Sequence, residues 1–292
     1  MRIVSSLLCV VLVSLVSRQV HSGENGILRI GGSTTLLPVI SRVAAEFMTK
    51  YPYWSDAAMN LPNLKTRIFV SGGGSGAGIR SVINGTIEIG LASRNIKEIE
   101  KRLLGNHTAF LVGKDAVVIA ANKNSAIAKH VDNFSTMQLI EIFTGRARST
   151  SDIIYSPTAQ PIVAYVRDSG AGSAELFQKM IMRDNRIDPT APQVSSQGRL
   201  LYRLETNNNA IGYLSSGLAF NSKKLKVFAV NGIIPTNQRV VTGEYPLTRP
   251  LLIIIKGANS KYSSNFIDYV LSEKGQNLMS SHGYVPIKKL IN

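Results

Sequence analysis

Three loops rich in glycine, serine and threonine hold the residues of this 292-residue sequence best suited to chemistry. They cover residues 31–35, 71–78 and 167–173, and each lies between an expected strand and an expected helix. The first turn of a helix presents backbone N–H groups without partners, and the helix dipole adds partial positive charge there. Glycine lets a ligand approach the backbone, and hydroxyl groups add hydrogen-bond donors. The loops therefore predict an anion site, although any single one is also explained as an N-cap and a turn.

The glycine-rich segment at residues 73–78 does not complete any nucleotide-binding or catalytic motif. Residues 73–78 have the glycine spacing of a P-loop start, but Ile79 and Arg80 stand where Lys and Ser or Thr are required. The same segment is one residue short of a dinucleotide fingerprint, and Ser75 lacks the second glycine of a nucleophile elbow. Beyond the first 22 residues, the histidines have no Cys or carboxylate at metal spacing: His107, His130 and His282. We expect no catalytic residue, no metal site and no cofactor.

Composition excludes several classes of protein. Hydrophobic residues make up 44% and charged residues 17%, which excludes an intrinsically disordered chain. The single cysteine excludes a disulfide framework. The formal net charge is +15, and such a basic chain attracts nucleic acids, membranes or small anions. Because the Lys and Arg residues are scattered singly or in pairs, we expect no nucleic-acid partner.

The N-terminus predicts export. Arg2 precedes an apolar stretch at residues 3–16 that is too short to span a bilayer comfortably, and Ser22 lies where a signal peptidase could cleave. We expect residues 1–22 to be a cleaved signal peptide of a periplasmic protein; the alternative is an uncleaved anchor.

The elements that would position the three loops alternate along the chain, which predicts an α/β fold. Residues 110–112 and 116–121 are apolar runs of the kind found in parallel strands buried on both faces. A β-rich stretch is expected from residue 215 to 241, and one amphipathic helix over 265–280. Crossovers of one hand would bring the three loops to one edge of the sheet. Further strands are expected at 27–30, 67–70, 86–91, 161–166, 210–214 and 251–255, and helices at 36–47, 79–83, 138–143 and 176–181.

Six motifs in order resemble the phosphate-binding proteins of bacterial phosphate ABC transporters. They lie at residues 32–38, 71–78, 88–94, 167–173, 209–215 and 245–251. The resemblance implies a type II periplasmic-binding-protein fold: a monomer of two lobes that close over one phosphate, which passes to a permease in the inner membrane. It also implies two crossings between lobes, near residues 112–115 and 245–250. The expected domains are 1–22 signal peptide, 23–114 with 248–292 as lobe 1, and 115–247 as lobe 2.

The resemblance also implies ligand contacts, carried over residue by residue. In the first loop they fall on Thr35 and the amide of Leu36, with Thr34 as an alternative to Thr35. In the second they fall on Ser75 and the amide of Gly76. The remaining expected ligand residues are Ser93, Arg94, Arg167, Gly172 and Ser173.

Two departures from the family pattern bear on ligand choice. Ala171 replaces a serine, and the loss of a hydrogen bond worth roughly 1.5–3 kcal/mol would weaken binding about 10–100-fold. Ser93 and Arg94 occupy the region where many members have an aspartate that accepts the proton of a protonated phosphate. Arg94 supplies only donors, or instead forms a surface or interlobe ion pair. Alternatives are therefore a binding protein for sulfate, molybdate or an organic phosphate, an exported phosphatase, and a surface adhesin or sensor.

Overall fold

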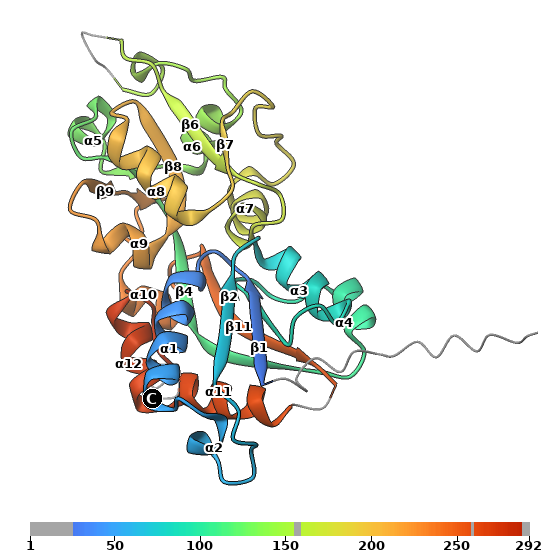
Figure 1. Ribbon diagram of the computed structural model, residues 1–292. Helices are drawn as coiled ribbons and strands as arrows, with labels where there is room; N and C mark the ends of the chain where they lie inside the picture. The colour runs from blue at the N-terminus through green and yellow to red at the C-terminus, as the bar shows by residue number, and fades with distance from the viewer. Residues whose placement is uncertain (1–25, 155–158, 258–259, 288–292) are drawn as a thin grey trace, which may run out of the picture.

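The computed structural model describes residues 26–154, 159–257 and 260–287, so the expected signal peptide lies outside the described residues. Figure 1 shows two lobes stacked end to end, with the long strand β4 (His107–Asn122) running from one lobe into the other. Strand β11 (Thr248–Lys256) lies antiparallel beside it. The α/β class and the two-lobed arrangement are confirmed. Among the described residues, no helix combines the length and the apolar character needed to cross a membrane.

Lobe 1 contains the elements from both ends of the described chain. Its helices flank a sheet in which β1 pairs parallel with two neighbours. Besides the crossing strands, its elements are β1 (Ile27–Gly32), α1 (Leu37–Lys50), α2 (Trp54–Ala57), β2 (Arg67–Ser71), α3 (Ser75–Ile83), β3 (Ile89–Ala92), α4 (Glu98–Leu104), α11 (Lys261–Leu271) and α12 (Glu273–Ser281).

Lobe 2 is built from the middle of the chain. Its elements are α5 (Ala126–His130), β5 (Asn133–Phe134), α6 (Thr136–Phe143), a 3-10 turn (Thr150–Asp152), β6 (Val163–Arg167), α7 (Gly172–Phe177), a π-helical turn (Gln178–Met182), β7 (Gln193–Val194), α8 (Gln197–Thr206), β8 (Ala210–Ser215), α9 (Ser216–Asn221), β9 (Leu225–Val227), β10 (Ala229–Val230) and α10 (Asn237–Thr242).

One sheet continues through both lobes. Its strand order is β2-β1-β3-β11-β4-β8-β6-β7, with β9 also paired to β4, while β10 pairs with β5 in a separate small sheet. The first part of β4 pairs with β11, and the part from Val117 onward pairs with β8. Each half of β4 therefore belongs to a different lobe, and the chain passes between lobes without leaving the sheet.

Three details differ from the sequence predictions. Residues 110–112 and 116–121 are not two parallel strands but parts of β4, which is antiparallel to β11 and β8. Residues 116–121 are fully buried, and a strand buried on both faces gives the same apolar run whichever way its neighbours point, whereas Leu111 in the other run is 38% exposed. The stretch expected to be β-rich contains α9 and α10 as well as short strands. The closing helix is two helices, because Ser272 is extended and caps α12 by accepting a hydrogen bond from the Gly275 N–H.

Each lobe has its own hydrophobic core. One cluster draws on residues from Ala116 to Leu247, together with Val285. A second draws on residues from Leu28 to Val112 and from Leu251 to Tyr284. The two clusters meet near residues 112–116 and 247–251, where the crossings are expected; the exact domain boundaries stay a prediction.

The lobe 2 core should be sensitive to loss of an aromatic ring. Phe143 packs against Phe177 at 4.7 Å between ring centroids, and Phe177 stacks on Tyr213 at 4.1 Å. Phe143→Ala should lower the free energy of unfolding by about 3–5 kcal/mol through lost burial and a cavity. Urea unfolding followed by circular dichroism measures this, with Met137→Ala as the control because Met137 lies on the same helix and is 64% exposed. Equal losses of unfolding free energy in Phe143→Ala and Met137→Ala would contradict the placement of Phe143 in the lobe 2 core.

Candidate functional site

A small pocket lies where the glycine- and hydroxyl-rich loops of the two lobes meet. The lobes close it so tightly that no space as large as a water molecule is left inside. Lobe 1 contributes the β1–α1 loop, the start of α3 and the end of β3, and lobe 2 contributes the end of β6 and the start of α7. In Figure 1 these elements face each other at the junction, with α7 above α3. The wall consists of Ser33, Thr34, Thr35, Gly74, Ser75, Ser93, Arg167, Ala171, Gly172 and Ser173.

Local hydrogen bonds shape the lobe 1 side of the pocket. The Ser33 hydroxyl accepts from the amides of Thr35 and Leu36 at 3.2 and 3.4 Å, which curls the loop into α1. Gly74 precedes α3 with φ of +90°, a conformation that favours glycine, and its N–H donates to the Gly32 carbonyl at 2.9 Å. The two loops are thereby held side by side.

The serines of the second and third lobe 1 segments contact each other directly. The Ser93 N–H donates to Ser75 Oγ at 3.0 Å, and the two hydroxyl oxygens lie 3.3 Å apart. Both side chains are almost fully buried. Buried hydroxyl groups need partners, so this pair fixes the start of α3 against the end of β3.

Arg167 is the only cationic residue on the pocket wall as described. Its guanidinium donates to the carbonyls of Val194 and Ser195, to Asp168 Oδ2 at 3.1 Å, and across the junction to Thr34 Oγ1 at 3.3 Å. Burial lowers its pKa, against the opposing effect of Asp168. The guanidinium is thus a fixed positive charge in a poorly solvated place.

The lobes are in close contact around the pocket. The Gly76 N–H donates to the Gly170 carbonyl of the other lobe at 3.2 Å. A Cβ atom placed on Gly172 would lie 2.6 Å from the Ser93 carbonyl oxygen and 3.0 Å from Ser75 Oγ. No side chain fits there, so glycine at 172 is what allows the lobes to meet.

The pocket contains most of the residues expected from the sequence. Those on its wall are Thr34, Thr35, Ser75, Ser93, Arg167, Gly172 and Ser173. Leu36, Gly76 and Arg94 are not on the wall. The Leu36 amide donates to the Ser33 hydroxyl and the Gly76 amide to the Gly170 carbonyl, so in this structure both amides have partners within the protein, and their ligand contacts stay predictions.

Arg94 pairs with carboxylates instead of facing the pocket. Its guanidinium donates to both oxygens of Glu100 at 2.7 and 2.6 Å, and Nε lies 3.1 Å from Glu175 of the other lobe. Burial alone would lower its pKa, but Glu100 and Glu175 outweigh burial and raise it. In this structure Arg94 therefore makes the interlobe ion pair expected as the alternative, and its direct ligand contact stays a prediction.

Six residues at or beside the pocket were not among the predicted ligand residues. Ser33, Gly74 and Ala171 lie on the wall, and Gln197 Nε2 donates to Ser173 Oγ at 3.0 Å. Asp115 and Arg249 form a buried ion pair beside the wall. A charged residue at the end of an apolar run is a usable signal for Asp115 and Arg249, because buried charges need partners. Nothing in the sequence singles out Gln197.

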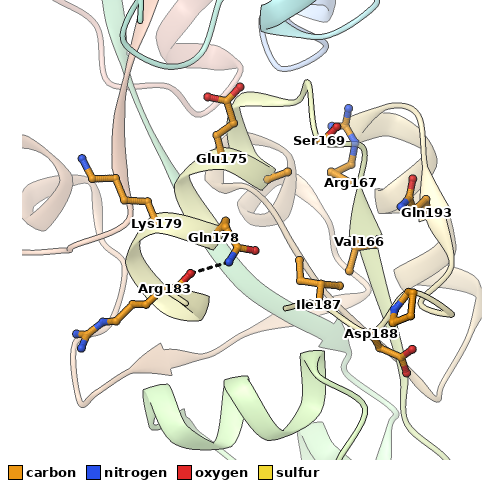
Figure 2. Close-up of a pocket in the computed structure, with 12 residues that line it drawn as sticks. Val166, Arg167, Ser169, Glu175, Gln178, Lys179, Arg183, Ile187, Asp188 and Gln193 are labelled. Atoms are coloured by element: carbon orange, nitrogen blue, oxygen red, sulfur yellow. Dashed lines mark hydrogen bonds between the residues drawn. The ribbon is translucent and has the colours of Figure 1, made fainter. Parts of the chain in front are cut away.

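A larger pocket of about 450 Å³ opens in lobe 2. Figure 2 shows Glu175, Lys179 and Arg183 around it, pointing in different directions. The Gln178 side chain is occupied by the carbonyls of Arg183 and Asn185, at 2.8 and 2.9 Å. The polar groups neither converge nor share a sign of charge, so the junction pocket is the better anion site. The described residues contain no group of three or more His, Cys, Asp or Glu placed to hold a metal ion.

Comparison with known proteins agrees with this geometry. A family model described as a PBP superfamily domain matches residues 19–274. The chain belongs to the PBP superfamily. It is 27% identical over 278 residues to the phosphate-binding protein PstS of Staphylococcus aureus strain USA300, covering 91% of this chain and 80% of that protein.

Solved structures of this superfamily share the fold. A putative phosphate ABC transporter substrate-binding protein with bound phosphate, from Clostridium perfringens, has a TM-score of 0.75 and 26% identity, covering 89% of this chain and 99% of that one. An ABC-type phosphate transport receptor from Vibrio cholerae has a TM-score of 0.67 and 24% identity, covering 88% and 99%. The resemblance based on the six motifs is confirmed, and the relatives are binding proteins and receptors, as expected for a chain that is not an enzyme.

The Arg94–Glu100 pair makes a prediction about pH. Burial would raise the pKa of Glu100, but hydrogen bonds from Arg94 and the Lys97 amide outweigh it and hold the pKa below its ordinary value. A lowered folded-state pKa contributes stability above the unfolded pKa of about 4.3, and this contribution is lost as pH falls through the folded value. Glu100→Gln should lower the free energy of unfolding by about 1–3 kcal/mol at pH 7 and by less below about pH 4.

Urea unfolding across this pH range measures the effect. Glu98→Gln is the matched control, because Glu98 lies on the same helix, is largely exposed, and pairs only with Lys101. A loss that is independent of pH would contradict the role of the ion pair.

Proposed function

We propose that this protein binds inorganic phosphate in the junction pocket and delivers it to an ABC permease. The observation that carries the proposal is the pocket wall: buried hydroxyl groups from both lobes and one guanidinium, with no carboxylate among its residues. Burying a dianion is costly unless several donors replace its lost water. Hydroxyl groups and the Arg167 guanidinium supply such donors.

The size of the pocket favours a small oxyanion. Sites for organic ligands usually measure about 300–1,000 Å³, whereas this pocket leaves no space as large as a water molecule while the lobes are in contact. This argues against an organic phosphate and against a phosphatase that must hold an ester. The named relatives from Staphylococcus aureus and Clostridium perfringens, a phosphate-binding protein and a transporter protein with bound phosphate, point to the same ligand.

Closure of the lobes would couple binding to delivery. Thr34 and Ser75 lie in lobe 1 and Arg167 and Ser173 in lobe 2, so all four reach one ligand only in the closed form. A ligand that binds the closed form better shifts the population toward it. The permease can then recognise the closed protein. We further propose that residues 1–22 are removed on export and that the periplasmic protein acts as a monomer.

Selectivity between phosphate and sulfate follows from the departures noted in the sequence. Ala171 lies on the wall without a hydroxyl, and no residue of the wall carries a carboxylate that could accept the ligand's proton. Sulfate carries no proton at neutral pH, so such an acceptor would reject it. Sulfate is therefore the second candidate ligand, and a competition titration separates the two.

Calorimetry tests the ligand directly. Inorganic phosphate added to residues 23–292 should bind one site with micromolar or tighter affinity, and Ser75→Ala should weaken binding about 10–100-fold by removing a hydrogen bond to a charged group. Ser81→Ala is the matched control on the same helix, outside the pocket wall. No heat and no shift in melting temperature at millimolar phosphate would overturn the proposal, and turnover of a phosphate ester lost in Ser75→Ala would indicate an enzyme instead.

A second experiment tests closure. Gly172→Ala places a methyl group against the Ser93 carbonyl only when the lobes meet, so it should weaken phosphate binding at least about tenfold while leaving the separate lobes folded. Small-angle scattering with phosphate should show a more open particle than the wild type. Gly198→Ala is the control, since nothing lies within 4 Å of a Cβ at that position. Unchanged affinity in Gly172→Ala would contradict closure over the ligand.

A further inference from the structure

A buried ion pair lies directly outside the pocket wall. Arg249 on β11 faces Asp115 on β4 in the antiparallel register of the two crossing strands. Nε and one terminal nitrogen of Arg249 donate to the same oxygen of Asp115, at 3.0 and 2.7 Å. The side chains are 1% and 0% exposed. Neither residue lies on the pocket wall, so neither contacts the ligand space directly.

The remaining hydrogen bonds of this pair reach both lobes. The second oxygen of Asp115 accepts from the hydroxyls of Ser215 and Ser216, each at 2.9 Å. Arg249 donates to Thr35 Oγ1 at 2.9 Å and to Ser93 Oγ at 3.2 Å. Asp115 therefore holds the guanidinium of Arg249 in place, and the guanidinium donates hydrogen bonds to two hydroxyls of the pocket wall.

Stability alone is a poor reason for such a pair. Removing two charges from water costs several kcal/mol, and apolar residues of similar volume often do equally well. Unlike two apolar residues, the ion pair donates hydrogen bonds, and it thereby decides which hydroxyl oxygens act as acceptors. An arginine only donates, whereas a hydroxyl carries one proton and two acceptor lone pairs. Once Thr35 Oγ1 accepts from Arg249, its own proton is left to give, whereas Ser93 Oγ also hydrogen-bonds to Ser75 Oγ, so that pair has one proton left to give.

The other hydroxyls of the wall follow the same rule. Ser75 Oγ accepts from the Ser93 amide, and Thr34 Oγ1 accepts from Arg167. Ser173 Oγ accepts from Gln197 Nε2, and the orientation of that carboxamide is fixed because the Ser215 N–H donates to its oxygen. Together with Ser33, which accepts from two amides, every hydroxyl of the described wall receives a hydrogen bond from a nitrogen.

We propose that Arg249, held by Asp115, is a positioning residue that biases the Thr35 and Ser93 hydroxyls toward donating to the bound oxyanion. The inference rests on the proposed function and specifies its ligand chemistry: the pocket favours oxygens that carry no proton. A fully ionised oxyanion such as sulfate then gains from every donor. A protonated phosphate has to donate its proton to a hydroxyl lone pair that accepts no other hydrogen bond.

Arg249→Lys tests the proposal while keeping the positive charge beside Asp115. A lysine lacks the planar fork and cannot serve Asp115, Thr35 and Ser93 together. The hydroxyl that loses its donor gains a second free lone pair and accepts the proton of phosphate more readily. Calorimetry with phosphate and with sulfate should show both affinities reduced, phosphate by about tenfold and sulfate by about a further three- to tenfold. The loss of phosphate affinity in the variant should also be smaller at acidic pH, where the ligand carries more protons.

Arg239→Lys, at a surface pair with Glu244, is the control and should leave both affinities unchanged. An unchanged ratio of the two affinities in Arg249→Lys would overturn the positioning role, because loss of charge or packing weakens both ligands alike. A wild-type protein that binds phosphate but shows no sulfate binding at millimolar concentration would also overturn it. A wild-type protein that binds neither anion would instead refute the proposed function.

A double variant guards against misfolding of Arg249→Lys. Asp115→Asn with Arg249→Met removes both charges, leaves an amide oxygen for the Ser215 and Ser216 hydroxyls, and deletes both donors to the pocket wall. With folding checked by circular dichroism, it should lose more sulfate than phosphate affinity. Equal losses would count against the proposal.

Discussion

A hydroxyl oxygen that already accepts a hydrogen bond from a nitrogen has one proton left to give, and this constraint governs the lobe junction. The hydroxyls of Thr35 and Ser93 accept from Arg249, and that of Thr34 accepts from Arg167. A buried donor left without an acceptor costs about 1–3 kcal/mol. The proposed oxyanion would supply acceptors for several such donors at once.

The crossing strands make this arrangement possible. Because β4 pairs with β11 in one half and with β8 in the other, Asp115 sits where the two lobes join. The Asp115–Arg249 ion pair hydrogen-bonds to Ser215 in lobe 2 and to Thr35 in lobe 1. The Arg94–Glu175 contact adds a link near the rim, and the absence of a side chain at Gly172 lets the walls touch. The contacts between the lobes and the hydrogen bonds to the wall hydroxyls thus involve neighbouring residues.

Much of the fold could be predicted because its signals are local. Helical spacing at residues 36–47 and glycine after the helix that ends near Asn84 mark α1 and α3 well. The errors concern features with no local signal. The direction of β4 depends on its neighbours, and the break between α11 and α12 depends on a single extended residue, Ser272. An apolar run reports burial but not which strand lies beside it.

The sequence by itself determined the class of fold and the loops of the site, because glycines, hydroxyls and apolar periodicity act over a few residues. It also placed Ser75, Arg167 and Ser173, which the structure brings to one pocket. Only the tertiary structure decided that Arg94 faces Glu100 and Glu175 and that Arg249 faces the pocket hydroxyls. The partner of a charged side chain depends on residues distant in the chain, and their positions are fixed only when the lobes pack together.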